Sequence, residues 1–131
     1  MPMLTIETDR REQFLDITDQ VRAALREQGS GSGICTVFSP HTTCGVTVNE
    51  GHDPDVAADA VRHLGELVPR FRGWRHGEGN SDAHVKTILV GASVTLPLEG
   101  GKLALGQWQR VFLCEFDGPR RRQVRVTVLA G

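Results

Sequence analysis

Polar clusters that follow hydrophobic runs are the part of this chain best suited to chemistry. They span Ser39–Glu50, His76–Lys86 and Leu105–Arg122, and each contains side chains that can bind a metal ion or a phosphate. A polar group at the end of a buried element costs stability unless a partner satisfies it, and such groups gather at functional sites. The sequence therefore predicts that these clusters share one pocket.

His41 is the first candidate, because it lies between Pro40 and two threonines where an apolar segment must turn. Its imidazole can ligate a metal or exchange a proton near neutral pH. The hydroxyls of Thr42 and Thr43 can orient the ring or bind phosphate oxygens. A turn histidine that is hydrogen-bonded to the backbone is the alternative, and the residues alone leave both interpretations open.

His76 and His84 are a weaker metal signal, since their spacing matches no helical zinc motif such as HExxH. If both reach His41, three imidazoles with an open fourth position suit zinc or another divalent ion. Glu50 can add a carboxylate. The alternative is that His76 is a solvated loop residue and His84 a satisfied core histidine.

The segment Asp117–Arg122 has two interpretations. As structure, Asp-Gly-Pro makes a hairpin turn and the arginines that follow keep a sheet edge soluble. As function, the guanidinium of Arg120 lies next to a rigid turn and offers a planar fork for bidentate phosphate binding. Arg121 and Arg122 are interpreted as solvated.

The other polar candidates also have structural alternatives. The amide of Gln109 can face a heteroaromatic ligand or pair within a sheet, and Trp108 is interpreted as a core residue. Lys86 shares the face of His84 only if this segment is a strand, and is otherwise a surface charge. Cys44 is interpreted as an inert buried thiol rather than a nucleophile.

Length and composition exclude several classes of protein. The 131 residues fit one domain, 1–131, that is long enough to bury a core. The net charge of -1 and the absence of Tyr argue against a nucleic-acid partner, and the charge argues against an anionic membrane surface. The cysteines show no CxxC spacing, and the N-terminus has no signal-peptide or spanning pattern. A cytoplasmic protein is expected.

The elements that must position these residues are mostly strands. Helices are predicted over residues 18–28 and from Asp53-Pro54, a strong start signal, to about Val68. Residues 81–90 are ambiguous and a helix is favoured. Strand patterns cover 4–8, 14–17, 34–38, 44–48, 93–98, 102–105, 109–116 and 123–129. Residues 34–48 should form a hairpin or a strand-to-strand crossing with His41 at its tip.

The motifs in these clusters resemble those of one family. HTT followed by an NE pair, DPDV at a helix start, N-x-D-x-H-x-K, LGxWQ and EFDGPR occur in the order and spacing of the YjbQ-type family, also called secondary thiamine-phosphate synthases. The resemblance covers most of the chain from about Ser39 onward. It implies a single compact α+β domain with largely antiparallel, sandwich-like sheets and two to three helices, and it implies a homotrimer.

The resemblance also implies a function. A thiamine-phosphate synthase joins an aminopyrimidine methyl diphosphate to a thiazole phosphate and expels pyrophosphate, so it must stabilise developing negative charge and align two rings. We expect this activity to be weak or secondary. A metal-dependent phosphohydrolase and a non-enzymatic trimeric ligand-binding protein are the alternatives.

Each candidate residue receives a role in this hypothesis. A divalent ion, Mg or Zn, suits the reaction, and a small phosphorylated molecule is the expected partner. The expected catalytic residues are His41, Glu50 and Arg120; the metal ligands are His41, His76 and His84; and the substrate-binding residues are Thr42, Thr43, Asn80, Lys86, Gln109 and Arg120.

Overall fold

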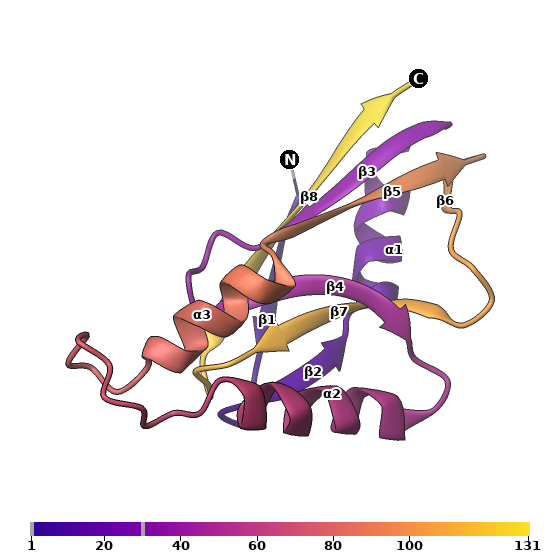
Figure 1. Ribbon diagram of the computed structural model, residues 1–131. Helices are drawn as coiled ribbons and strands as arrows, with labels where there is room; N and C mark the ends of the chain where they lie inside the picture. The colour runs from indigo at the N-terminus through magenta and orange to yellow at the C-terminus, as the bar shows by residue number, and fades with distance from the viewer. Residues whose placement is uncertain (1, 30) are drawn as a thin grey trace.

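The computed structural model describes residues 2–29 and 31–131, and these form helices and strands in an α+β arrangement (Figure 1). The helices are α1 (Thr18–Gln28), α2 (Pro54–Leu67) and α3 (Ser81–Val90). The strands are β1 (Met3–Glu7), β2 (Gln13–Asp16), β3 (Gly33–Phe38), β4 (Cys44–Glu50), β5 (Ser93–Glu99), β6 (Lys102–Leu103), β7 (Gln109–Glu115) and β8 (Arg121–Ala130).

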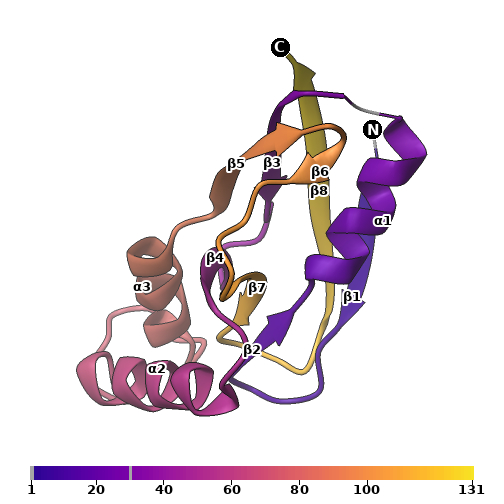
Figure 2. The same ribbon diagram turned by 90° about the vertical axis from the view of Figure 1, so that its right-hand side faces the viewer.

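The strands form two antiparallel sheets that share a hydrophobic core. Sheet A has the order β1-β8-β3-β5-β6 and sheet B has the order β2-β7-β4. Val37 and Val126 of sheet A pack in one cluster with Val46 and Leu113 of sheet B. The helix α1 adds Leu25 to the same cluster, so it lies on the face of sheet A that also meets sheet B (Figure 2). The expected sandwich-like α+β fold is confirmed.

The strand β7 is buried on both faces because a second layer covers the far side of sheet B. Val111 and Leu113 point into the core between the sheets. Phe112, Cys114 and Phe116 point the other way, into a smaller cluster with α2 and α3. Since successive side chains of a strand alternate between faces, this pattern makes β7 the central element of the fold.

Local sequence explains where α2 begins. The Asp53 carboxylate accepts a hydrogen bond from the Asp55 amide at 2.9 Å, and Pro54 occupies the first turn, as the start signal predicts. The helix over 81–90 is also confirmed. It places Asp82 and Lys86 one turn apart on the same face, where they form an ion pair at 2.9 Å.

The turns near the candidate residues carry the chain from one sheet to the other. Between β3 and β4, at His41, the chain crosses from sheet A to sheet B, so of the two alternatives for residues 34–48 the strand-to-strand crossing is confirmed. The expected hairpin turn at Asp117-Gly118-Pro119 is wrong. After the cis Gly118-Pro119 peptide, β8 leaves sheet B and pairs with β1 and β3 in sheet A.

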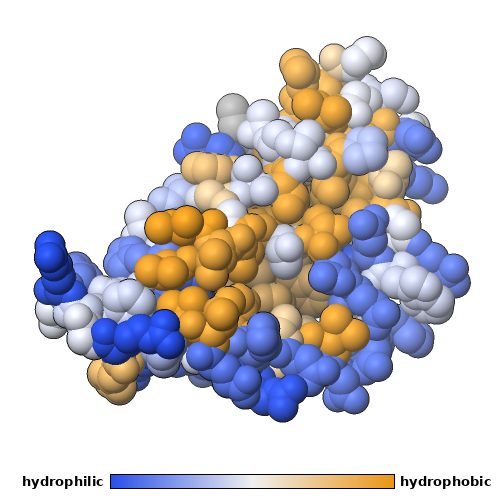
Figure 3. Space-filling model, viewed as in Figure 1, coloured by the Kyte–Doolittle hydropathy of each residue, from blue (hydrophilic) through white to orange (hydrophobic). Residues whose placement is uncertain are grey.

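Apolar side chains remain uncovered on the outer face of sheet A and on α3. Ile34, Phe38 and Leu129 are exposed on that sheet, and Ile88 and Leu89 are exposed on α3. Figure 3 shows hydrophobic surface over α3 and over the strands beside it. Exposed apolar surface of this extent marks a contact region. In the described residues, no helix has the length and apolar character needed to cross a membrane.

Candidate functional site

A buried ion pair stands at the point where β7 crosses to β8. The Arg122 Nε donates to Glu115 Oε1 at 2.7 Å, and Arg122 Nη2 donates to Glu115 Oε2. The same Nη2 donates to Thr43 Oγ1 at 2.9 Å, and Thr8 Oγ1 donates to Glu115 at 2.8 Å. Burial alone would lower the pKa of Arg122, but the hydrogen bond and charge of Glu115 raise it. The expectation that Arg122 is solvated is therefore wrong, since its exposed fraction is 3%.

His41 lies beside this ion pair and binds the first part of β8. Its Nε2 accepts a hydrogen bond from the Gln123 amide at 2.9 Å. A neutral imidazole that accepts at Nε2 carries its proton on Nδ1, so the ring presents a donor on its other side. Partial burial lowers the pKa of His41, and the charge of Arg122 lowers it further. His41 is thus a neutral hydrogen-bond donor at neutral pH.

This geometry predicts that protonation of His41 destabilises the fold. The folded pKa lies below the ordinary 6.5, so the unfolded chain binds more protons and stability is lost as the pH falls below about 6.5. Guanidinium unfolding of the wild type and of His41→Gln at pH 7.5 and pH 5 should show the stability advantage of the wild type shrinking in acid. An advantage that is the same at both values would contradict the prediction.

Arg120 and Asn80 converge on Asp117. The Asp117 Oδ2 accepts from Asn80 Nδ2 at 2.9 Å and from Arg120 Nη2 at 3.1 Å, and Arg120 Nε donates to the Asp117 carbonyl at 2.7 Å. These bonds hold the half-exposed guanidinium in one direction and leave further N–H donors for a phosphate. Thr42, which follows His41 in the chain, is exposed, and its hydroxyl has no hydrogen-bond partner within the described ranges.

The first turn of α3 carries a second buried charge cluster. Arg11 donates to both Asp82 oxygens, at 3.2 and 3.0 Å. Lys86 contacts Asp82 at 2.9 Å and also forms an ion pair with Glu12. Burial by itself raises the pKa of Asp82, but the hydrogen bonds from Arg11 and Lys86 hold it below its ordinary value.

The exposed fraction of Lys86 is only 1%, so its interpretation as a surface charge outside a strand is wrong. The ammonium is occupied by two carboxylates and helps to fix α3 against the β1–β2 connection. The His76 and His84 rings contact each other, with centroids 5.5 Å apart and planes nearly perpendicular. His76 Nε2 also lies 3.5 Å from Glu78.

Glu50 and Gln109 lie at the opposite end of sheet B. They are register partners, whereas Cys44 at the other end of β4 pairs with Glu115. The six residue steps between these pairs span roughly 20 Å of strand. The Glu50 carboxylate accepts from the Asp53 amide at 3.2 Å, and the Gln109 side chain accepts from the Gly106 amide at 2.8 Å.

An aromatic pair lies next to Glu50 and Gln109. The rings of His52 and Trp108 lie 5.1 Å apart. Trp108 is 50% exposed, so its interpretation as a core residue is wrong. It lies outside β7 in the turn that precedes the strand, where no second layer covers it.

One chain therefore brings His41, Thr43, Arg120 and Asn80 to the β7–β8 crossing and keeps Glu50 apart from them. Over residues 2–29 and 31–131, no group of three His, Cys, Asp or Glu side chains is arranged to hold a metal ion. The His41 Nε2 is already engaged by a backbone amide. The expected three-histidine site therefore does not fit the described residues of one chain.

Comparison with known proteins gives the family. Residues 3–131 match the family described as UPF0047 protein YjbQ-like. The UPF0047 protein of Methanocaldococcus jannaschii is 45% identical over 124 residues, covering 95% of this chain and 90% of the relative. The UPF0047 protein YugU of Bacillus subtilis is 44% identical and covers 96% of each chain.

This chain belongs to the YjbQ-like UPF0047 family. Solved structures of similar chains agree with the fold of this YjbQ-like protein. An uncharacterised conserved protein of the family from Clostridium acetobutylicum superimposes with a TM-score of 0.96 at 43% identity, over 98% of this chain and all of that one. The conserved hypothetical protein TT1486 of Thermus thermophilus gives a TM-score of 0.92 at 50% identity, over the same shares.

The site of this YjbQ-like protein includes residues to which the sequence patterns assigned no functional role. Glu115 and Arg122 form its buried base, and Arg11 orients Asp82. One signal for Glu115 was present in the sequence, because β7 alternates and places this carboxylate on the same face as Val111 and Leu113. Nothing in the sequence pattern linked Arg11 to residue 82, since that contact depends on the tertiary fold.

Proposed function

We propose that this protein is a transferase of the thiamine-phosphate synthase type, with a weak or secondary activity. It would join the methylene carbon of an aminopyrimidine methyl diphosphate to the ring nitrogen of a thiazole phosphate. The new C–N bond forms as the C–O bond breaks, and pyrophosphate leaves with the electron pair. No proton needs to be transferred in that step, so the site must mainly align the rings and stabilise the departing anion.

The observation that carries the proposal is the set of donors at the β7–β8 crossing. Arg120 is held by Asp117 with guanidinium N–H groups to spare. His41 is close enough to Arg120 for that charge to lower its pKa, and it presents an Nδ1–H. Thr42 adds an exposed hydroxyl. A preorganised cation with neutral donors beside it suits a phosphate or diphosphate group.

The buried ion pair supports these donors from beneath. Thr8 Oγ1 accepts from the Arg120 amide at 2.9 Å and donates to Glu115 at 2.8 Å, so the backbone of Arg120 is tied to the pair. Donors positioned before the ligand arrives lose little freedom on binding, which is the physical basis of electrostatic catalysis.

A divalent ion would be held by the substrate and not by the three histidines. Magnesium is commonly bound through one or two carboxylates together with substrate phosphates, and it keeps several of its waters. We propose that magnesium enters with the diphosphate substrate. The ion would supply charge neutralisation for the leaving group, and the side chains at the crossing would orient that group.

We also propose that the protein is a homotrimer. Support comes from the uncovered apolar side chains on sheet A and α3, which would be shielded by other copies. Further support is the separation of Glu50 and Gln109 from the β7–β8 crossing, because an assembly can unite residues that one chain keeps apart. Sedimentation velocity of the purified protein measures this directly.

The synthase proposal is tested with purified protein, both substrates and magnesium. Thiamine phosphate, measured as its fluorescent oxidation product, should increase in proportion to enzyme concentration. Product no higher than an enzyme-free blank at high protein concentration would reject the transferase. Release of phosphate from simple esters in the same preparation would favour a phosphohydrolase, and ligand binding without turnover would favour a binding protein.

A further inference from the structure

A basic loop, residues 69–79, projects beyond the end of α2. It exposes 79% of Phe71, together with Arg72 and Arg75. Its shape is fixed, because the Trp74 indole donates to the Arg70 carbonyl at 3.0 Å and Arg70 Nε donates to the Gly79 carbonyl at 3.2 Å. A rigid loop that offers an aromatic ring between cations resembles the anchor of a protein interface.

Two cations of this loop are not paired within the chain. In the part of the chain that is described, neither Arg72 nor Arg75 has an ion-pair or hydrogen-bond partner. Arg70 contacts the ring of Phe71 at 5.2 Å to the centroid. The whole chain carries a net charge of only -1, so the loop is a local positive region. A surface that binds it through charge must then be a local negative region.

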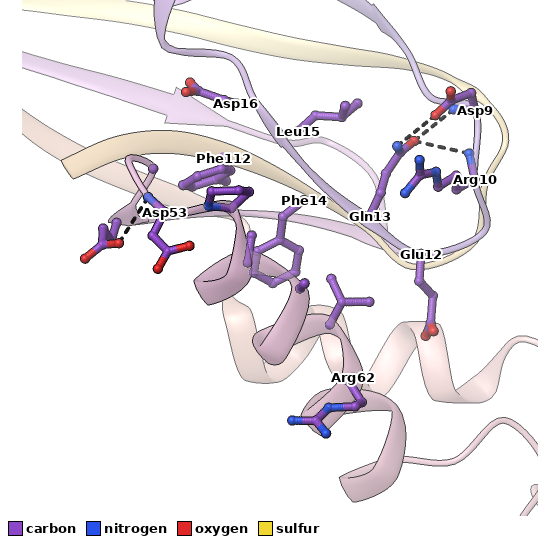
Figure 4. A pocket seen from close by; sticks show the side chains of 16 residues that line it. Asp9, Arg10, Glu12, Gln13, Phe14, Leu15, Asp16, Asp53, Arg62 and Phe112 are labelled. Carbon is purple, nitrogen blue, oxygen red and sulfur yellow. Dashed lines mark hydrogen bonds between the residues drawn. The ribbon is translucent and has the colours of Figure 1, made fainter. Parts of the chain in front are cut away.

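An acidic groove of about 720 Å³ lies between β2 and α2, along the helix from Pro54 to Arg62 (Figure 4). Figure 4 shows Phe14 pointing from β2 towards α2, with Asp53 on one side and Glu12 on the other. The floor is apolar. It includes Phe14, Ala57, Val61 and Phe112, and the carboxylates around it are Asp9, Glu12, Asp16, Glu50 and Asp53.

Negative charge in the acidic groove is only partly neutralised. Asp16 is paired with Arg110 at 2.7 Å, and Glu12 is paired with Lys86. The other three carboxylates have only neutral hydrogen-bond partners within the described residues. Asp9 accepts from a glutamine side-chain amide, and Glu50 and Asp53 each accept from a backbone amide. The groove is also lined by two arginines, Arg10 and Arg62, and Arg62 forms an ion pair with Asp59.

We propose that the basic loop of one copy of this chain docks in the acidic groove of the next copy. Phe71 would cover the apolar floor, and Arg72 and Arg75 would meet the free carboxylates. The loop does not fill the groove of its own chain, since none of the residues that line the groove belongs to residues 69–79. The helix is 14 residues long, which corresponds to roughly 21 Å.

This contact is heterologous, since it joins two different surfaces of the same chain. Heterologous contacts close into rings or grow into filaments. A ring of three agrees with the trimer in the proposed function, and the inference rests on that part of the proposal. The docked loop also brings His76, five positions after Phe71, to the copy that supplies Glu50. The candidate residues that one chain keeps apart would then meet between two chains.

Charge reversal and its compensation test the docking. Arg72→Glu with Arg75→Glu should weaken assembly at least tenfold in sedimentation equilibrium, and Phe71→Ala should weaken it as well. Asp9→Lys with Glu50→Lys should also weaken it, and the four charge changes combined in one chain should restore it. Restoration requires the two surfaces to touch, so it cannot come from a variant that merely fails to fold.

A control reverses two arginines elsewhere on α1, the partly exposed Arg22 and the exposed Arg26. Arg22→Glu with Arg26→Glu should leave assembly unchanged. A trimer that persists through reversal of the basic loop would overturn the docking and leave the homotrimer standing. A wild type that is monomeric at all concentrations would overturn both. Loss without restoration in the combined variant would overturn the pairing of these two surfaces. The synthase assay decides the chemistry independently.

Discussion

Replacing Arg122 with methionine is expected to lower the free energy of unfolding by about 3 to 5 kcal/mol. The guanidinium is 3% exposed and binds both oxygens of Glu115, whose exposed fraction is 0%. Its removal leaves a buried carboxylate without a cation and takes a donor from Thr43. Removing one partner of a buried pair costs far more than the pair itself contributes, because the remaining charge is desolvated. Urea unfolding followed by circular dichroism measures the loss.

The neighbouring Arg121 provides the control. It forms an ion pair with Glu7 at 2.8 Å, but both side chains are largely exposed. Arg121→Met should therefore change the free energy of unfolding by no more than roughly 0.5 kcal/mol. The double variant Arg122→Met, Glu115→Leu should recover part of the loss, since no charge is then buried. Equal effects of Arg121→Met and Arg122→Met would contradict the role assigned to the buried pair.

The secondary structure could largely be predicted from local signals. The start of α2 at Asp53-Pro54 and the strand around Phe112 follow from capping chemistry and β-rich composition, which act over a few residues. The crossing at Pro119 could not be predicted in the same way. Asp-Gly-Pro fits a tight turn equally well, and only the pairing of β8 with β1 and β3 shows that the chain changes sheets there.

The candidate site was also predicted only in part, because some of its contacts depend on residues far apart in the sequence. The structure places His41 and Arg120 in one polar region at the β7–β8 crossing and Glu50 a strand length away. The sequence predicts a strand over 44–48, between His41 and Glu50, so the separation of these two residues follows from it. The sequence pattern also assigned Arg122 to solvent and Lys86 to solvent or a ligand. Both are buried, because each forms an ion pair with a carboxylate that the fold brings next to it, and a local pattern does not show such a partner.

Replacing Arg120 with alanine is expected to lower kcat/KM for thiamine-phosphate formation by about 10²- to 10³-fold. Arg120 is the exposed cation at the crossing, and Asp117 fixes its direction through Nε and Nη2. Its charge would oppose the negative charge that grows on the departing pyrophosphate, so the loss should be mainly in kcat. Initial rates of thiamine-phosphate formation at limiting and at saturating substrate, measured for wild type and variant side by side, give kcat/KM and kcat separately.

Arg120→Lys separates charge from geometry, because lysine keeps the positive charge and loses the planar fork. Its rate should lie between those of the wild type and Arg120→Ala. Arg121→Ala, which removes an adjacent cation engaged by Glu7, should keep nearly the full rate. Folding is checked by the urea midpoint, which Arg120→Ala should change little because the guanidinium is half exposed. An Arg120→Ala variant that retains more than about a third of the wild-type rate would remove the leaving-group role from this residue.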